Sequence, residues 1–173
     1  MTIVEMPRIG TQVQMQPAGI IVHAMAEYLD TEPYDICAYD FLRNQGLSAH
    51  YLVTPSGCVL KCAEENQVCY HAKGKNAWND EEQGTVGTIG IEILVPGLHT
   101  YASFADRIRG TEWCYHKSKQ WGASCELVRD ILQRHDILPT EVERHSDVSP
   151  GRKVDPGKGF LWEKFLREVE GIG

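Results

Sequence analysis

Residues 88–95 read TIGIEILV, and this stretch decides the fold class of the chain. A short apolar run rich in isoleucine is typical of a buried β-strand. Because side chains alternate between the two faces of a strand, the odd-numbered residues, three isoleucines and a valine, share one face, and Glu92 lies on the other. The sequence therefore predicts a central strand that carries one carboxylate on an apolar surface and ends at Pro96 and Gly97.

Two segments on the N-terminal side predict further strands. Residues 19–23 (GIIVH) form a continuously apolar run after a polar arm, and His23 stands at its end. Residues 48–62 (SAHYLVTPSGCVLKC) predict two strands joined by a turn at residues 54–57. These strands are expected to lie in one sheet with residues 88–95.

Three segments predict helices. Asp35 is expected to cap a helix over residues 36–44, and Gly46 is expected to stop it. Apolar residues at helical spacing predict an amphipathic helix over about residues 118–134. Leu161, Phe165 and Val169 recur at helical spacing and predict a closing helix.

The remaining segments are polar or irregular. A loop is expected over residues 72–86, and residues 98–115 are expected to be irregular, with a short helical turn around residues 104–108. Residues 73–86 and 96–113 are candidates for the walls of a groove that holds a ligand. Strands mixed with helices in this order predict an α/β fold with a single domain over residues 1–173 and a core of about residues 18–170.

Charge and composition exclude several classes of function. The formal net charge of -7 opposes non-specific binding to nucleic acid and to anionic membranes. No apolar run is long enough for a membrane span. The N-terminal residues lack the basic start and apolar stretch of a secretory signal, so we expect synthesis in the cytoplasm.

The six cysteines are expected to be reduced and mostly buried. Cys58 and Cys62 lie in one predicted strand, roughly 13 Å apart at the rise of a strand, which is too far for a disulfide. The other cysteines show no CxxC spacing of the kind that structural zinc sites use.

Three features carry groups that can do chemistry. Glu92 lies on an apolar strand, where an unpaired carboxylate costs on the order of several kcal/mol, so it forms an ion pair, faces solvent, or is held against a metal or a substrate. Residues 145–157 (HSDVSPGRKVDPG) concentrate charged groups between rigid turns, as functional loops do, although a structural loop can share this composition. His23 ends an apolar strand, where it can point into a cleft. The histidines expected to be structural or superficial are His99, His116 and His135.

Taken together, these fragments resemble the zinc-dependent N-acetylmuramoyl-L-alanine amidases, a family that includes AmpD-type amidases, phage amidase endolysins and peptidoglycan recognition proteins. The matching fragments follow the family's order over about residues 18–170, and the last is the most specific. They are IVHAMA, SAHYLVTPSG, CYHAKG, TVGTIGIEI and RHSDVSPGRKVDPG. The resemblance implies a mixed central β-sheet covered by helices.

The resemblance also implies a metal site and two catalytic groups. One zinc ion is expected on His23, His145 and Asp155, with one coordination position left open, as in catalytic zinc sites. Glu92 is then the expected general base, and Lys153 is expected to stabilise the oxyanion.

Two further histidines are expected at the substrate. His71, in YHAKG, matches a histidine that lines the family's substrate cleft, with a packed loop histidine as the alternative, and His50 is expected to bind substrate as well. Some family members carry a catalytic tyrosine directly before the histidine of the second strand. Here Ala49 occupies that position, a departure that resembles the AmpD-type branch and favours Glu92 as the base.

The expected function is hydrolysis of the amide bond between N-acetylmuramic acid and L-alanine of peptidoglycan by a phage-type endolysin that acts on the cell wall. The alternatives are an AmpD-type recycling amidase acting on anhydro-muropeptides in the cytoplasm, a toxin or phage tail component, and a non-catalytic peptidoglycan-binding module. The expected partner is peptidoglycan or a muropeptide, and the expected state is a monomer.

Overall fold

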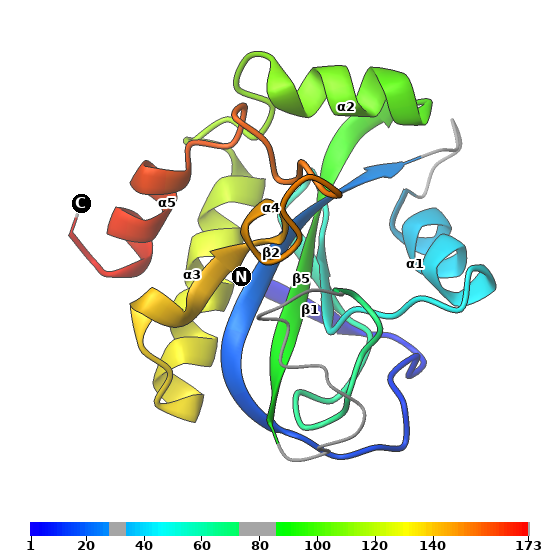
Figure 1. Ribbon diagram of the computed structural model, residues 1–173, viewed down its shortest axis with the longest axis vertical. Helices are drawn as coiled ribbons and strands as arrows, with labels where there is room; N and C mark the ends of the chain where they lie inside the picture. The colour runs from blue at the N-terminus through cyan, green and yellow to red at the C-terminus, as the bar shows by residue number, and fades with distance from the viewer. Residues whose placement is uncertain (28–33, 73–85, 173) are drawn as a thin grey trace.

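A mixed β-sheet organises the molecule, for which the computed structural model describes residues 1–27, 34–72 and 86–172. Within these residues the sheet has six strands in the order β1-β4-β3-β5-β2-β6 (Figure 1). Only the β3–β4 pair is antiparallel. The strands are β1 (Thr2–Glu5), β2 (Gln16–Glu27), β3 (Tyr51–Val53), β4 (Cys58–Lys61), β5 (Val86–Leu98) and β6 (Val142–Arg144).

Helices cover both faces of this sheet, which confirms the predicted α/β class. Figure 1 shows α3 and α5 on one side of the sheet and α1 on the other. The helices are α1 (Tyr34–Asn44), α2 (Tyr101–Arg109), α3 (Lys119–His135), α4 (His145–Val148) and α5 (Trp162–Val169). None of the helices in the described ranges is long and apolar enough to cross a membrane.

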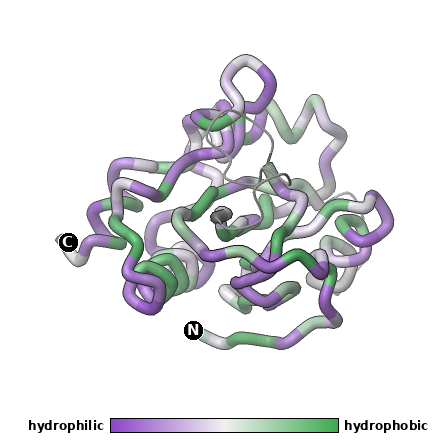
Figure 2. The backbone as a smooth tube through the Cα atoms, turned by 60° about the horizontal axis from the view of Figure 1, so that its bottom comes forward, coloured by the Kyte–Doolittle hydropathy of each residue, from purple (hydrophilic) through white to green (hydrophobic). Residues whose placement is uncertain are grey.

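Each face of the sheet has its own apolar core, as the alternation of side chains requires. Ile91 and Val22 point toward α3 and α5, where they pack in the larger core with Trp121 and Phe165. Leu94 points the other way and packs in a smaller core with residues of α1. In Figure 2 the apolar stretches of the central strands lie inside the molecule, whereas the apolar N-terminal stretch lies at its periphery. Glu92 and His23 share the face of Leu94, so this face also carries the polar residues of interest.

Most predicted elements are confirmed. The turn at residues 54–57 joins β3 to β4, and the helix predicted over residues 118–134 is α3. Helix α1 ends before Gly46, whose φ of +65° suits a helix stop. It begins at Tyr34, so Asp35 lies inside the helix instead of capping it. The loop predicted over residues 72–86 falls almost wholly outside the described residues.

Several predicted boundaries are wrong. Strand β2 continues past His23, and β5 continues past Pro96 and Gly97, because the residues beyond pair with each other across the two strands. The register shifts between Ala26 and Glu27, opposite this Pro-Gly pair, so the sheet absorbs the pair as an irregularity. A nine-residue helix, α2, replaces the short turn expected around residues 104–108.

Two short strands lie where the sequence predicts no element. Strand β1 forms within the N-terminal arm and pairs with β4, and β6 pairs with β2 just before the loop of residues 145–157. Both strands have partners far away in the sequence, so no local pattern announces them. Because β6 pairs with β2, the residue that follows β6, His145, lies beside β2.

Cys62, Cys69, Cys114 and Cys125 are free thiols and are buried. Burial raises the pKa of the Cys62, Cys69 and Cys114 thiols to about 12, so these thiols stay protonated and unreactive at neutral pH.

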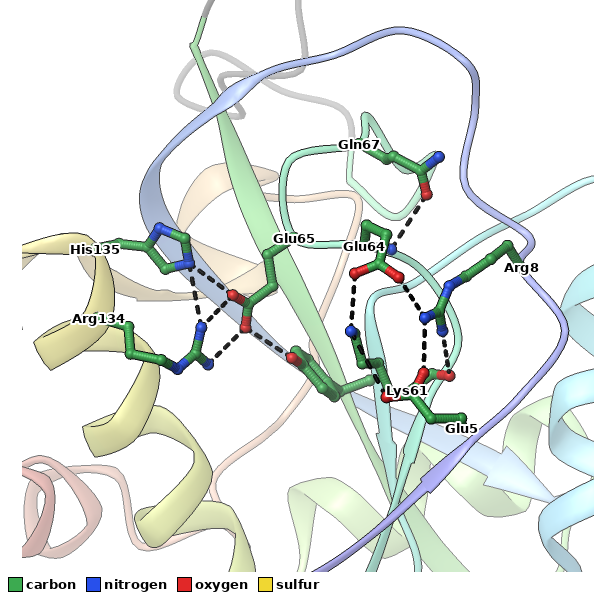
Figure 3. Close-up of polar contacts among 9 residues, drawn as sticks. Glu5, Arg8, Lys61, Glu64, Glu65, Gln67, Arg134 and His135 are labelled. Atoms are coloured by element: carbon green, nitrogen blue, oxygen red, sulfur yellow. Dashed lines mark hydrogen bonds and ion pairs between the residues drawn. The ribbon is translucent and has the colours of Figure 1, made fainter.

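A polar cluster joins the loop after β4 to the end of α3 (Figure 3). The Glu65 carboxylate accepts hydrogen bonds from Tyr51 Oη at 2.6 Å and from the Arg134 guanidinium, and it contacts His135 Nε2 at 2.6 Å. Burial favours the neutral form of Glu65, but these partners outweigh burial and hold its pKa at about 2. Nearby, Glu64 forms more exposed ion pairs with Lys61 and Arg8.

Glu65→Gln is expected to lower the free energy of unfolding at pH 7 by about 2–3 kcal/mol. This value already allows for the screening of Arg134 by water. Since the folded-state pKa is depressed, this stabilisation is complete above the unfolded pKa of roughly 4.3 and is lost as the pH falls toward 2. Urea unfolding at pH 7 and at pH 3.5 measures both effects. Glu64→Gln is the matched control and should cost less than about 1 kcal/mol. Equal losses for the two variants would contradict the expectation.

Candidate active site

Three side chains from separate parts of the chain converge on one point. His23 Nδ1 lies 2.8 Å from His145 Nδ1 and 3.5 Å from Asp155 Oδ2, and His145 Nδ1 lies 2.9 Å from the same oxygen. All three side chains are buried. Among the described residues, their three ligand atoms lie close enough together to hold one metal ion.

The pairing of β2 with β6 explains why the two histidines meet. Val22 is the register partner of Arg144 in this parallel pair, so the next residues, His23 and His145, lie side by side. His145 also begins α4, where the chain turns away from the sheet. Two residues 122 positions apart in the sequence are thereby brought into contact.

The loop that carries Asp155 is held by hydrogen bonds to the backbone of Asp155 and of the next residue, Pro156. The Asp155 carbonyl accepts a hydrogen bond from Ser146 N at 2.9 Å, and the Pro156 carbonyl accepts one from the buried Trp113 Nε1 at 2.9 Å. Gly157 has φ of +76°, and a Cβ there would stand 2.3 Å from the Ile108 carbonyl oxygen. The end of the loop is therefore packed directly against the last turn of α2 and against Trp113 beyond it, contacts that sequence reasoning missed.

The donor set fits a zinc ion. Burial is the main cause that lowers the pKa of His23 to about 4, so its imidazole is neutral at pH 7. Burial favours the neutral form of Asp155, but the hydrogen bond with His145 and the nearby His23 imidazole hold its pKa well below the ordinary value. Tetrahedral zinc, with bonds of about 2.0–2.2 Å, separates neighbouring donors by roughly 3.3–3.6 Å. One of the three separations here, 3.5 Å, has this length, and the other two, 2.8 and 2.9 Å, are shorter. His145 Nε2 is buried without a hydrogen-bond partner in the part of the chain that the structure describes, which leaves Nδ1 as its engaged atom.

Glu92 lies directly beside the cluster. It is the register partner of His23 on the neighbouring strand, and its Oε1 is 3.8 Å from His23 Nδ1. Burial and the negative charge of Asp155 raise the pKa of Glu92 to about 8, and the positive charge of Lys153 opposes this rise. The carboxylate is thus held next to the metal-binding atoms and not on an open face of the sheet.

Lys153 brings positive charge to the same place. Its backbone N–H donates to the Ser149 carbonyl at 3.0 Å, and this hydrogen bond closes a turn in the loop. One residue stands between Lys153 and Asp155 in the sequence. Its ammonium group is near enough to lower the pKa of both His23 and Glu92. Among the described residues it forms no ion pair, so its charge is available to a ligand.

The two remaining histidines differ in their surroundings. His71 Nδ1 lies 3.0 Å from His23 Nε2, so His71 touches the metal-binding cluster. His50 is completely buried, with Nδ1 accepting from Gly90 N at 2.9 Å and Nε2 2.9 Å from the Gln67 carbonyl. In this arrangement His50 presents no free ring nitrogen to a substrate. Its predicted contact with substrate stays a prediction, as does that of His71.

Comparison with known proteins agrees with this geometry. The family model described as N-acetylmuramoyl-L-alanine amidase matches residues 13–158. The chain is 27% identical to N-acetylmuramoyl-L-alanine amidase AmiD of Escherichia coli over 96% of its length and 59% of that protein's length. It is 25% identical to 1,6-anhydro-N-acetylmuramyl-L-alanine amidase AmpD of Enterobacter cloacae, covering 86% of this chain and 73% of AmpD.

Solved structures share the fold. The endolysin amidase LysCS from Clostridium intestinale superposes with a TM-score of 0.68 at 20% identity, over 99% of this chain and 97% of that one. AmiD of Escherichia coli, in complex with the substrate anhydro-N-acetylmuramic acid-L-Ala-D-gamma-Glu-L-Lys, superposes with a TM-score of 0.66 at 25% identity. That match covers 94% of this chain and 61% of AmiD.

Proposed function

This chain belongs to the N-acetylmuramoyl-L-alanine amidase family, and from that membership we propose that it hydrolyses the amide bond between N-acetylmuramic acid and L-alanine of peptidoglycan or its fragments. The observation that carries the proposal is the buried convergence of His23, His145 and Asp155 beside Glu92. Two imidazoles and one carboxylate are the donor set of a catalytic zinc site. The proposed cofactor is therefore one zinc ion on these three residues.

The residues around this cluster divide the reaction between them. A zinc ion held there supplies Lewis-acid polarisation of the amide carbonyl and activation of water. Glu92 accepts the proton of the attacking water and passes it to the departing amine of L-alanine. Lys153 donates to the oxyanion as the carbonyl carbon becomes tetrahedral. The C–N bond then breaks, which leaves a carboxylate on the muramic acid and a free amine on the peptide.

The environment of Glu92 suits a general base that works near neutral pH. Burial raises the pKa of this carboxyl, whereas positive charge beside it favours the charged form. The Lys153 ammonium favours the charged carboxylate and so lowers the pKa of Glu92. A cation held by the adjacent donors would lower it in the same way. We infer that a bound zinc ion lowers the pKa of Glu92, which increases the fraction of carboxylate at neutral pH.

Two biological roles fit this chemistry. We propose a phage-type endolysin that degrades the cell wall, in line with the match to LysCS over nearly the whole of both chains. The second candidate is an AmpD-type amidase that acts on anhydro-muropeptides. It is favoured by the sequence similarity to AmpD and AmiD, the latter solved with an anhydro-muropeptide. The expected state is a monomer in both cases.

Mass spectrometry of the products tests the reaction and separates the two roles. Purified sacculi and a soluble anhydro-muropeptide are each incubated with the zinc-loaded protein. Release of free stem peptides with an unblocked L-alanine amine is the expected result. Faster release from sacculi supports the endolysin role, and faster release from the soluble fragment supports the AmpD-type role. Binding to sacculi without any cleavage would show a non-catalytic module.

Lys153→Ala is expected to lower turnover by about 10²–10³-fold, because it removes a donor to the oxyanion. Zinc content should not change, since Lys153 is not among the three donor residues. Lys158→Ala is the matched control, because Lys158 is an exposed lysine near the same loop. Turnover on the muropeptide and zinc content by elemental analysis decide the outcome. A similar loss in both variants would reduce the role of Lys153 to general surface charge.

A further inference from the structure

His71 connects the metal-binding cluster to the backbone of β5. On one side, its Nε2 lies 3.0 Å from the carbonyl oxygen of Thr88, near the start of β5. On the other side, its Nδ1 lies 3.0 Å from Nε2 of His23. The opposite nitrogen of His23, Nδ1, faces His145 and Asp155. Two imidazoles thus stand in series between a backbone carbonyl and the cluster.

Hydrogen bonding gives this series a single direction. A carbonyl oxygen can only accept, so His71 Nε2 must carry the hydrogen and donate it to Thr88. A neutral His71 ring has one hydrogen, so its Nδ1 is an acceptor, and His23 Nε2–H must be the donor to it. The remaining nitrogen of His23, Nδ1, then holds a lone pair directed at the cluster.

We propose that His71 is a positioning residue, which holds the His23 ring in place and keeps its hydrogen on Nε2 so that the Nδ1 lone pair is presented to the zinc ion. This inference rests on the proposed zinc site. Hydrogen bonds from the outer nitrogen of a metal-binding histidine fix its tautomer and orientation, and losing such a partner weakens metal binding. In this chain the partner is another imidazole, which is itself oriented by a main-chain carbonyl.

Gly90 makes room for this arrangement. A Cβ at position 90 would stand 2.4 Å from Cγ of His71. Replacement of Gly90 by any other residue would therefore displace the His71 ring. The Gly90 N–H donates to His50 Nδ1, and the Gly90 carbonyl accepts from His50 N at 3.0 Å. The His50 ring then stands edge-on to His71 with centroids 5.8 Å apart. The fully engaged His50 therefore forms part of the wall that holds His71 in position.

Two variants of nearly equal shape test the role of the acceptor at His71. In His71→Asn, Oδ1 is the same number of bonds from the backbone as Nδ1 of histidine and can still accept from His23. His71→Leu has the same branching without an acceptor. Zinc affinity of the metal-depleted proteins is measured by competition with a chromophoric chelator, with circular dichroism as a check of folding. We expect His71→Leu to weaken zinc binding about 10–100-fold, and His71→Asn to recover most of that loss.

Long-range ¹H–¹⁵N correlation spectra of the metal-depleted protein read the tautomers directly, whether or not a variant folds. The expected result is a hydrogen on Nε2 in both His71 and His23. A hydrogen on Nδ1 of His23 overturns the proposal, and so does equal zinc affinity of the Leu and Asn variants. Failure of the wild-type protein to bind zinc would instead overturn the proposed function, and the tautomers would still decide the arrangement of the two rings.

Discussion

Asp155→Ala is expected to lose almost all bound zinc and, with it, almost all hydrolysis of the muropeptide amide. Asp155 contributes the only carboxylate among the three converging donors, and its oxygen lies within 3.5 Å of both histidine nitrogens. Two neutral imidazoles that remain would compensate a divalent charge poorly, and a buried cation without that compensation is costly. We expect zinc to fall from about one per chain to under about a tenth after dialysis.

Asp147→Ala is the matched control for this experiment. Asp147 belongs to the same loop motif, but its side chain is exposed and pairs with Arg144 at 2.7 Å, away from the cluster. Removal of an exposed ion pair should cost less than about 1 kcal/mol and leave zinc in place. Elemental analysis and turnover are measured on both variants after identical dialysis. Full zinc occupancy and activity in Asp155→Ala would refute the assignment of the third ligand.

Sequence patterns predicted the strands well where a strand buries an apolar run. Residues 88–95 and 19–23 identified β5 and β2, because isoleucine and valine recur at every second position in the first and form a continuous apolar run in the second. The ends of these strands were predicted less well. Pairing across β2 and β5 carries both strands beyond the apolar runs, and local signals such as Pro96 and Gly97 yield to that pairing.

The candidate site was predictable only in part, because its geometry depends on register. No local pattern shows that His23 meets His145, since the contact follows from the pairing of Val22 with Arg144 in a strand of three residues. The ligand set came from resemblance to a family; the structure brings these three residues together, and their binding of zinc stays a prediction. His50 was also expected to bind substrate, which stays a prediction, and no sequence pattern shows that both its ring nitrogens contact backbone groups.

The roles of His71 and Gly90 illustrate a second limit. The glycine in TIGIEI breaks the apolar pattern of β5, and the sequence alone offers no reason for it. The structure shows that the His71 ring occupies the space where a Cβ would stand. A glycine within a strand is a general signal for the close approach of another group, but the sequence does not show which group approaches.

Glu92→Gln is expected to lower turnover by about 10²–10⁴-fold while the fold and the zinc content are retained. Glutamine has the size of glutamate and can keep a hydrogen bond, but it cannot accept and release a proton near neutral pH. Because Glu92 is 3.8 Å from His23 and is not one of the three converging donors, metal binding should survive the change. Loss of zinc in this variant would place Glu92 among the ligands instead.

The pH dependence of turnover separates a base from a group that only shapes the site. If Glu92 takes the proton of the attacking water, turnover in the wild type rises with pH as the carboxyl ionises, and Glu92→Gln lacks that acidic limb. Glu92 lies beside the Asp155 carboxylate and the Lys153 ammonium, so the limb reports a coupled set of groups and only the comparison with the variant assigns it. A Glu92→Gln protein with near-normal turnover and an unchanged limb would require another base. His71, whose Nδ1 lies 3.0 Å from His23 Nε2, and His50 are then the next residues to replace.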